Sequence, residues 1–550
     1  MIPSMNFKAA SSSSQRLPSN HHSTTMKVLG LSLLGLLAAT QGGECSRTKF
    51  ATKCEGLGKT LARQFDNAKV NLTDFVKAGT NLTAPSTHAT CAAFNQPLDV
   101  DLCRVKMYIS TSKKSGITLE SWLPLDWTGR FLSVGNGGLG GCISYDDMAY
   151  AAARGFSVVG TNNGHDGNTG LPFYKNRQVL EDFAYRALHK GVVAGKKITK
   201  ALYGKKHTKS YYLGCSTGGR QGFKEAQSFP DDFDGIVAGA PAFDFGNLQA
   251  WSGHFYSLTG PPGSSTFLTA AQWSLVVEDV LDQCDGLDGQ VDGIIEDPDL
   301  CQYRPESLIC GEKKTANCIT GLQAGVVRDV FSPLYDATGT LLYPRLQPGA
   351  NATSTIWSGV PFQYSVDWWR YVIYNDPSWG PELTLDDIEA AKDVDTFGID
   401  TWDGDLSDVK NRGAKILHYH GLQDPIITSD NSARYYNHVS RTMGLRSEEL
   451  DEFYRYFRIS GMGHCSGGSG AYNIGNRQSG FSTEEPEGNV LNAMVQWVEK
   501  GIAPDYVLGT AYTSAKKDVV AFERKHCKYP LRNSYKGTGD PNAADSWHCV

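Results

Sequence analysis

The sequence has no excess of basic charge. Its 52 lysines and arginines are outnumbered by 58 aspartates and glutamates, which gives a net charge of −6 over 550 residues. A protein that binds nucleic acid through bulk charge needs a basic surface to neutralise phosphates. We therefore expect no nucleic-acid partner.

Long apolar runs and closely spaced cysteine pairs are also lacking. No stretch reaches the roughly 20 apolar residues that span a bilayer, so we expect no membrane partner. No Cys-x-x-Cys pair occurs, which argues against a zinc ribbon. What is present is typical of a large globular protein: 40% apolar residues, 20% charged residues, and the length of roughly three and a half average domains.

The N-terminal region predicts secretion. Residues 1–25 are polar and rich in serine, and we interpret them as an extension or as sequence upstream of a true start at Met26. One lysine, an apolar run over 28–39 and small residues after it form the pattern of a signal peptide, assigned here to 26–42. Three Asn-x-Ser/Thr acceptor sequences then predict a secreted, extracellular glycoprotein. They lie at Asn71, Asn81 and Asn351.

Thirteen cysteines are many for a cytosolic protein and indicate an oxidising compartment. The count is odd, so at least one has no partner within the chain; we expect this to be Cys45, nearest the expected cleavage site. Short loops between cysteines indicate local disulfides, although spacing alone leaves the connectivity open. The predicted pairs are Cys284–Cys301, Cys310–Cys318 and Cys527–Cys549, together with Cys54–Cys103 and Cys91–Cys142.

Strand-like and helix-like segments alternate along much of the chain, which indicates an α/β fold with a mostly parallel sheet. Strands are expected at 105–109, 130–134, 156–160, 210–214, 235–240, 415–420 and 454–459, and helices at 179–203, 219–228 and 487–500. Residues 45–100 are interpreted as a segment that wraps the surface. The rhythm breaks over 243–399, which we interpret as an inserted lid domain, so that 45–242 and 400–550 form the catalytic domain.

The motif Gly214-Cys215-Ser216-Thr217-Gly218 matches Gly-x-Ser-x-Gly. It follows a predicted strand and precedes a predicted helix, as a nucleophile elbow requires. Small neighbours fit the sharp turn, and backbone N–H groups at a helix N-terminus can stabilise an oxyanion. Ser216 is therefore the candidate nucleophile; the alternative is an ordinary glycine-rich turn between strand and helix.

A nucleophilic serine needs a base, and the base needs a group that orients it. Asp424 follows a late predicted strand, and His464 lies in a glycine-flanked loop 40 residues further on. Serine, acid and histidine in this order are typical of an α/β-hydrolase. The 208 residues between Ser216 and Asp424 exceed what two or three βα units need, and the excess matches the inserted lid.

Other candidates for base and acid have simpler interpretations. His418 and His420 lie inside a predicted strand and are interpreted as strand residues or as residues behind the site. Asp430 is the rival acid and is interpreted as a helix cap before residues 431–433.

Two cysteines adjoin the proposed catalytic groups, because Cys215 precedes Ser216 and Cys465 follows His464. A disulfide between them would tie the nucleophile to its base across 250 residues of chain. Since catalytic rate depends strongly on the geometry of reacting groups, such a tether would serve more than stability.

With these motifs, the chain resembles the fungal tannase and feruloyl esterase family of serine esterases, over residues of about 50 to 549. The family joins the Cys-Ser and His-Cys motifs by a disulfide, here Cys215–Cys465. The resemblance implies an α/β-hydrolase fold with Ser216 as nucleophile, His464 as general base and Asp424 as its orienting acid.

The oxyanion hole needs two backbone donors. We expect one from Thr217, the residue after the nucleophile, and the other from Gly137 or Gly138 in the glycine-rich run that follows the strand at 130–134. The same run spells Gly-x-Gly-x-x-Gly, so a dinucleotide site is the alternative. No clear helix is expected after it, and Cys142 stands where that helix would begin.

Residues 284–294 carry three aspartates and three glycines, and hard oxygen ligands on a tight loop suit Ca²⁺. The spacing is not that of an EF-hand. By the family resemblance, the ligands are the side chains of Asp285, Asp288 and Asp292 with the carbonyls of Gln290 and Ile294. The metal is expected to be structural, without a link to the triad; the alternative is a solvated acidic turn.

Seven of the eleven tryptophans lie between 251 and 402, and the lid could use them to stack a phenolic acid or to build its own core. The family acts on esters of ferulic, coumaric or gallic acid, so the expected substrate is a small phenolic ester or a feruloylated polysaccharide. A feruloyl esterase is preferred to a tannase, because family tannases often carry an internal Lys-Arg processing site and this chain has no Lys-Arg dipeptide. A non-catalytic, calcium-dependent binding protein is the alternative from another class. The sequence does not indicate the oligomeric state.

Overall fold

The computed structural model describes residues 31–84, 88–312 and 316–550. Contacts divide the chain into two compact units, residues 1–50 and 51–550. In the first unit the backbone is helical from Leu31, within helix α1 (Leu31–Gln64). The predicted extension over 1–25 and the first residues of the predicted signal peptide lie outside the described residues. No described helix combines the length and apolar character required to cross a membrane.

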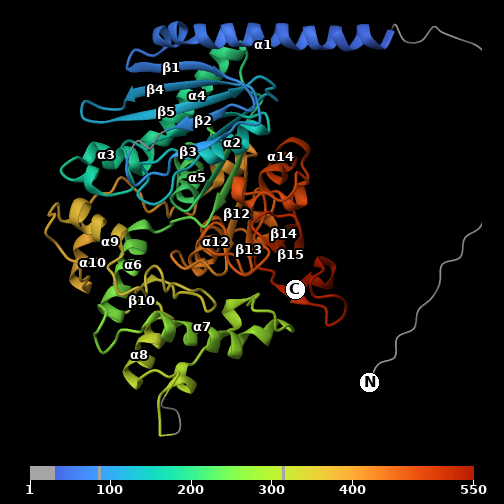
Figure 1. Cartoon of the computed structure of the whole chain (residues 1–550). Helices are drawn as coiled ribbons and strands as arrows, with labels where there is room; N and C mark the ends of the chain where they lie inside the picture. The colour runs from blue at the N-terminus through green and yellow to red at the C-terminus, as the bar shows by residue number, and fades with distance from the viewer. Residues whose placement is uncertain (1–30, 85–87, 313–315) are drawn as a thin grey trace, which may run out of the picture. The chain divides into compact units, whose positions relative to one another are not determined.

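The core of the second unit is a nine-stranded sheet with the order β1-β4-β5-β7-β6-β8-β9-β12-β13 (Figure 1). The strands are β1 (Ala68–Val76), β4 (Leu102–Ser110), β5 (Gly116–Pro124), β7 (Ser157–Thr161), β6 (Arg130–Val134), β8 (Lys209–Cys215), β9 (Gly235–Gly239), β12 (Lys415–Gly421) and β13 (Tyr454–Ile459). From β7 to β13 neighbouring strands are parallel, whereas β1, β4, β5 and β7 pair antiparallel. The predicted mostly parallel α/β sheet is confirmed.

Helices cover both faces of this sheet (Figure 1). Helices α2 (Tyr145–Ala153) and α14 (Val490–Lys500) share one apolar core with inward-facing residues of the strands, among them Leu132, Leu213 and Leu417. On the other face, α4 (Ala187–Tyr203) packs against Phe131 and Val159, while α5 (Thr217–Ser228) packs against Tyr212 and α12 (Ser429–Met443). Burial on both faces explains why the parallel strands are almost continuously apolar.

Three expectations about the elements need correction. Residues 45–100 do more than wrap the surface, because β1 is the edge strand of the main sheet and β2 (Asn81–Ala84) pairs with β3 (Phe94–Pro97). The helix expected over 179–203 is split into α3 (Arg177–Glu181), a π-helical turn and α4. A helix, α2, does follow the glycine-rich run after β6.

The segment between β9 and β12, called the lid segment (residues 243–399), carries its own helices and a small hairpin within the unit 51–550. Its elements are α6 (Phe245–Thr259), α7 (Ala270–Cys284), α8 (Gly321–Val330), β10 (Leu334–Tyr335), β11 (Leu341–Tyr343), α9 (Gln363–Trp368) and α10 (Leu385–Lys392). Its apolar core continues into Leu139 and Phe183 of the sheet-bearing part. The lid segment therefore packs directly on the part of the fold that carries Ser216.

The C-terminal part adds α11 (Ser407–Arg412), α13 (Ser447–Leu450) and two hairpins, β14 (Tyr506–Tyr512) with β15 (Val520–Cys527) and β16 (Asn533–Tyr535) with β17 (Trp547–Cys549). Six disulfides join the described cysteines, in the pairings expected from the sequence, and Cys45 is free and exposed. They are Cys54–Cys103, Cys91–Cys142, Cys215–Cys465, Cys284–Cys301, Cys310–Cys318 and Cys527–Cys549.

Candidate active site

Ser216 occupies a strained turn between β8 and α5. Its backbone has φ 66° and ψ −126°, a region that non-glycine residues rarely adopt. Two hydrogen bonds hold the turn: the Ser216 N–H donates to the Gly239 carbonyl at 3.0 Å, and the Ala242 N–H donates to the Ser216 carbonyl at 3.2 Å. This is the geometry of a nucleophile elbow, which exposes the serine side chain above the sheet.

The glycines around Ser216 are required by close packing. A Cβ on Gly219 would lie 2.2 Å from the Gly239 carbonyl oxygen, and one on Gly214 would lie 2.8 Å from the Gly218 carbonyl oxygen. Either substitution would push α5 away from the sheet, and so the Gly-rich motif is a steric requirement of the turn.

His464 and Asp424 meet at the carboxyl ends of β12 and β13. His464 Nδ1 lies 2.6 Å from Asp424 Oδ2, which leaves Nε2 available for another partner. Asp424 is completely buried, whereas the His464 side chain is 20% exposed. The carboxylate can therefore orient the imidazole from behind while the ring faces the solvent-accessible side.

The surroundings of Asp424 keep it ionised. Its Oδ1 accepts the N–H groups of Ile426 and Ile427, each at 2.9 Å, and His420 Nε2 lies 3.2 Å from Oδ2. Burial by itself would raise the pKa of Asp424, but the charge of His464 and the bonds from both histidines hold the pKa well below its ordinary value. A buried anion at this position stabilises the imidazolium that a general base becomes.

His420 lies in β12 and contacts Asp424. This agrees with its interpretation from the sequence as a strand residue or a residue behind the site. Asp430 needs correction: the cap of α12 is Thr428, whose side chain accepts from the Asp430 N–H, while Asp430 lies in the first turn with Arg345 at 3.6 Å. Sequence reasoning missed Gln347 of the lid segment, which is buried and donates to the Asp424 carbonyl at 2.8 Å. No local motif marks it, because it reaches the acid only through the tertiary fold.

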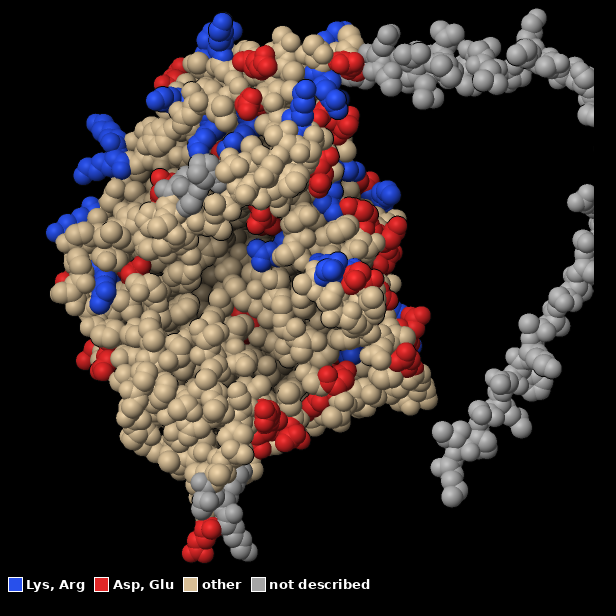
Figure 2. All heavy atoms as spheres, in the orientation of Figure 1, with Lys and Arg blue, Asp and Glu red and all other residues tan. Residues whose placement is uncertain are grey.

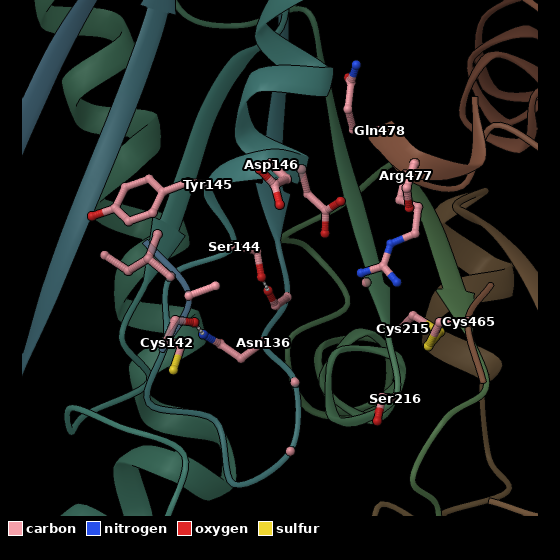
Figure 3. Close-up of a pocket in the computed structure, with 18 of the residues that line it drawn as sticks. Asn136, Cys142, Ser144, Tyr145, Asp146, Cys215, Ser216, Cys465, Arg477 and Gln478 are labelled. Atoms are coloured by element: carbon pink, nitrogen blue, oxygen red, sulfur yellow. Dashed lines mark hydrogen bonds between the residues drawn. A yellow bond between two sulfur atoms is a disulfide. The ribbon is translucent and has the colours of Figure 1, made fainter. Parts of the chain in front are cut away.

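Ser216 and His464 line one pocket of about 710 Å³. Among the described residues no hydrogen bond joins the Ser216 hydroxyl to His464, although such bonds are often long before substrate binds. Figure 2 shows this face of the molecule hollowed near its centre, with charged atoms on the right-hand rim. In Figure 3 the Arg477 side chain reaches into the pocket near the disulfide, and Ser216 lies below it at the start of α5.

The disulfide Cys215–Cys465 connects the two catalytic loops directly, with its Cα atoms 6.1 Å apart. Cys465, like Ser216, has a positive φ, here 63°. The disulfide thus joins the residue that precedes Ser216 to Cys465, so that two unfavourable backbone conformations, at Ser216 and at Cys465, lie at or next to the same covalent link.

The proposed oxyanion loop lies beside Ser216. The Thr217 hydroxyl donates to the Gly138 carbonyl at 2.5 Å, which ties the loop to the start of α5. Asn168, which sequence reasoning missed, accepts the Leu139 N–H at 2.7 Å and donates to the Tyr364 hydroxyl at 2.6 Å. Within the described part of the chain, the N–H groups of Thr217 and Gly138 make no hydrogen bond.

The glycine-rich run at residues 135–141 does not form a dinucleotide site, although helix α2 follows it. Cys142 is bonded to Cys91, and the side chain of Asn136 donates to the carbonyls of Cys142 and Thr161 at 2.9 Å and 2.7 Å. The loop is therefore closed against the protein and leads to the serine, where two free N–H groups suit an oxyanion.

A family model described as tannase and feruloyl esterase matches residues 103–378 and 381–550. The chain belongs to the tannase and feruloyl esterase family. Within this family, a probable feruloyl esterase B-2 of Neosartorya fischeri is 53% identical over 94% of this chain and 99% of its own. A probable feruloyl esterase B of Aspergillus clavatus is 53% identical with the same coverage.

Solved structures of the family have the same fold. A crystal structure of feruloyl esterase B from Aspergillus oryzae has a TM-score of 0.88 and 49% identity, covering 91% of this chain and all of that chain. Tannin acyl hydrolase from Aspergillus niger has a TM-score of 0.70 at 21% identity, covering 90% of this chain and 95% of that one, which shows the fold alone. The predicted α/β-hydrolase fold and carboxylic ester hydrolase class are confirmed.

The calcium loop that the family resemblance implies, residues 285–294, holds its carboxylates in tight turns. Asp285 accepts the N–H groups of Gly293 and Ile294 at 2.9 and 3.0 Å, and Asp288 accepts the Gln290 N–H at 3.0 Å. Asp292 lies 3.0 Å from an Arg524 nitrogen.

The loop supplies the kind of donor that a hard divalent cation takes, carboxylate and carbonyl oxygens, but within the described residues 285–294 no three carboxylates lie within 4.8 Å of one another. Burial, followed by the nearby charges of Glu296 and Asp292, raises the pKa of Asp288 to about 7. A cavity of about 70 Å³ borders Asp288 and Glu296. Crowded carboxylates with raised pKa values are the groups that a cation stabilises.

Among the described residues, one group of three acidic or histidine side chains is gathered closely enough to hold an ion: His189, Glu225 and Asp232. His189 Nδ1 lies 2.7 Å from Asp232, and the Lys196 ammonium donates to the Asp232 carbonyl. Because a lysine already supplies the positive charge, we assign this group to an ion-pair network.

The lid tryptophans are not part of the pocket. Five of the seven are fully buried in the core that the lid segment shares with the sheet: Trp251, Trp273, Trp357, Trp368 and Trp369. The rings that line the 710 Å³ pocket are Phe94, Tyr145 and Tyr364. The idea that lid tryptophans stack the substrate is therefore not supported by the structure.

The pocket has two chemically different sides. Tyr364 and Ile426 line both this pocket and a smaller apolar cavity of about 30 Å³ beside Ser216. The other side carries polar and charged side chains, including Asp146 and Arg477 (Figure 3). Asp147 also lines the pocket. Burial raises the pKa of Asp147, and the nearby positive charge of Arg477 offsets part of that rise.

The three predicted glycosylation sites, Asn71, Asn81 and Asn351, are all exposed.

Proposed function

We propose that this protein is a secreted serine esterase that hydrolyses feruloyl esters of plant cell-wall carbohydrate with Ser216, His464 and Asp424. One observation carries the proposal. Ser216, on a strained strand–helix turn, lines the same pocket as His464, whose Nδ1 lies 2.6 Å from the buried Asp424. A strained serine, an oriented imidazole and a buried anion are the parts that activate a hydroxyl for acyl transfer.

In the acylation step, His464 Nε2 accepts the proton of the Ser216 hydroxyl while Oγ bonds to the ester carbonyl carbon. The carbonyl oxygen becomes an oxyanion and accepts hydrogen bonds from the N–H groups of Thr217 and Gly138. When the tetrahedral intermediate collapses, the C–O bond to the alcohol breaks and protonated His464 gives its proton to the leaving oxygen.

Deacylation repeats these steps with water as nucleophile. His464 accepts a proton from water, the hydroxide oxygen bonds to the acyl carbon, and the bond to Ser216 breaks as the proton returns to Oγ. The phenolic acid then leaves. Asp424 stays ionised throughout, because its pKa is held low by its histidine neighbours.

Feruloyl esters are proposed because the relatives at 53% identity are named feruloyl esterases and cover almost the whole chain. No observation on this chain favours a galloyl ester. The two sides of the pocket support an ester of an aromatic acid and a sugar. We assign the acyl group to the side of Tyr364 and Ile426, and the alcohol hydroxyls to the side of Arg477 and Asp146.

Calcium, secretion and glycosylation complete the proposal. Asp285, Asp288 and Asp292, with the carbonyls of Gln290 and Ile294, would hold Ca²⁺ in the lid segment, where it neutralises a carboxylate cluster. Six disulfides support an oxidising compartment, and exposed asparagines at the acceptor sequences support glycosylation.

The test is a paired hydrolysis assay of methyl ferulate and methyl gallate with wild-type protein and Ser216→Ala. Ser332→Ala is the matched control, because that exposed serine follows α8 and only donates to the Arg328 carbonyl. We expect ferulate turnover at least tenfold faster than gallate turnover, lost in Ser216→Ala and kept in Ser332→Ala. Full activity of Ser216→Ala would overturn the assigned nucleophile, and a preference for gallate would overturn the assigned acyl group.

A further inference from the structure

The loop that carries His464 is closed by two internal backbone hydrogen bonds, from the Gly463 N–H to the Gly467 carbonyl and from the Gly470 N–H to the Gly461 carbonyl, each at 2.9 Å. Residues 461–470 form no regular element and include five glycines, three of which have a positive φ: Gly461, Gly467 and Gly468. Such a segment gains much conformational freedom when contacts are lost, because glycine has the least restricted backbone. The position of His464 therefore depends on what the loop touches.

One neighbour is the cation loop of the lid segment, residues 285–294. The Ser469 hydroxyl lies 3.1 Å from the Gly293 carbonyl. The Ile294 side chain packs against Gly461, where an added Cβ would lie 3.3 Å from Ile294 Cγ2. The cation loop therefore contacts the loop that carries His464, a contact that the sequence did not indicate.

The residues that follow the cation loop anchor to the same edge of the sheet. Arg458, at the end of β13, donates to Asp297 at 2.6 Å. Arg524 of β15 pairs with both Asp292 and Glu296, and Asn533 donates to Glu296 at 3.0 Å. Ion pairs and a hydrogen bond therefore hold Asp292 and the residues that follow the cation loop, while Gly293 and Ile294 contact the histidine loop.

Ser469 also contacts the turn that carries the catalytic acid. Gln423 precedes Asp424; its side-chain amide donates to the Ser469 hydroxyl at 2.9 Å and accepts the Ser469 N–H at 3.1 Å. The Gln423 N–H donates to the Met462 carbonyl at 2.8 Å, two residues before His464. Ser469 and Gln423 thus join three segments: the cation loop, the acid turn and the histidine loop.

We propose that Ser469 and Gln423 are positioning residues that couple the cation loop to His464 and Asp424. This inference rests on the proposed function. A divalent cation on the aspartates would fix the Gly293 carbonyl, and Ser469 would pass that constraint to the two loops whose relative position orients the imidazole. Coupling of this kind changes the rate of the chemical step and leaves substrate binding nearly unchanged, since neither residue lines the pocket.

The experiment compares wild type, Ser469→Ala, Ser469→Thr, Gln423→Ala, the inactive reference Ser216→Ala and the control Ser332→Ala, each with CaCl2 and after chelation by EDTA. Three quantities are measured: kcat and KM on methyl ferulate, the rate at which a fluorophosphonate labels Ser216, and the melting temperature. The label reacts with the activated serine without any ester substrate, so it reports on Ser216 and His464 independently of the acyl preference.

We expect Ser469→Ala and Gln423→Ala to lower kcat and the labelling rate about tenfold with KM within twofold. Ser469→Thr keeps the hydroxyl at an exposed position and should restore both rates. Chelation should slow wild type and Ser332→Ala by a similar factor, but Ser469→Ala by less than a further twofold, because the link is already cut. The melting temperature should fall on chelation in every variant.

Wild-type rates in Ser469→Ala, or an equal loss on chelation in wild type and Ser469→Ala, would overturn the coupling. Failure of the proposed function has a different result: wild type would resemble Ser216→Ala with both the ester and the label. The two hypotheses are therefore tested separately by the same set of proteins.

Discussion

The disulfide Cys215–Cys465 allows the sharpest test of how this site is held together. We consider the double variant Cys215→Ala/Cys465→Ala. The disulfide closes a loop of 250 residues, for which the chain-entropy relation predicts about 5.5 kcal/mol of stability. The value is slightly smaller when the two disulfides inside the loop are counted, because they shorten it.

The same variant should lose activity by a separate route. Ser216, which follows Cys215, and Cys465 itself both have positive φ values, 66° and 63°. Without it, each backbone can relax toward an ordinary conformation, which displaces the Ser216 hydroxyl and the His464 ring relative to each other. A displacement of about 1 Å between reacting groups costs roughly 100-fold in rate.

The matched control is Cys310→Ala/Cys318→Ala. That disulfide closes only 8 residues within the lid segment, so the same relation predicts a loss of about 2.5 kcal/mol. The assays are urea denaturation for the free energy of unfolding and kcat on methyl ferulate at a temperature where circular dichroism shows both variants folded. We expect the first variant to lose both stability and kcat, and the control to lose stability alone. A folded first variant with kcat within twofold of wild type would refute the positioning role, as would an equal loss of kcat in the control.

Three further changes have outcomes that follow from the structure. Gly138→Ala should lower kcat at least 100-fold, because a Cβ there would lie 2.4 Å from the Asn168 side-chain oxygen and Gly138 has φ 57°. Burial, followed by the negative charge of Asp299, raises the pKa of Asp430 to about 6, so the stability of the wild type falls as the pH rises from about 4 to about 6. Asp430→Asn should match wild type near pH 4 and exceed it by up to about 3 kcal/mol above pH 6. Arg477→Gln should raise KM for a feruloylated sugar several-fold more than for methyl ferulate, because it removes polar contact on the alcohol side.

Each of these has its own check. Unchanged kinetics in Gly138→Ala would exclude that loop from the oxyanion hole. For Asp430, urea unfolding across pH 4 to 8 is compared with Asp408→Asn, an exposed aspartate in the first turn of α11, which controls for the charge at a helix start; a gain that does not grow with pH would contradict the raised pKa. Equal changes in KM for both esters would remove Arg477 from alcohol recognition.

The local parts of the fold and site follow closely from the sequence. The strand ending at Cys215, the glycines after it and the helix from Thr217 are neighbours in the chain, so pattern and turn chemistry predict them together. The strand expected at 130–134 has the same bounds in the structure, as does the one at 454–459. The order of Ser216, Asp424 and His464 along the chain likewise predicted an α/β-hydrolase sheet. These residues follow β8, β12 and β13, whose carboxyl ends lie at the same edge of the sheet.

Tertiary structure decided what the side chains of distant segments do. Gln347 reaches the carbonyl of Asp424, and Asn168 holds the loop that we propose for the oxyanion hole, yet neither lies near a motif in the chain. The tryptophans of the lid segment could have lined the substrate pocket or filled a core; the packing buries five of them completely. Ser469 shows most clearly why sequence alone is insufficient: its hydroxyl joins Gly293 and Gln423, which are 176 and 46 residues away along the chain. Residues that chemistry requires next to one another in a turn can be predicted, whereas partners brought together only by folding of the whole chain cannot.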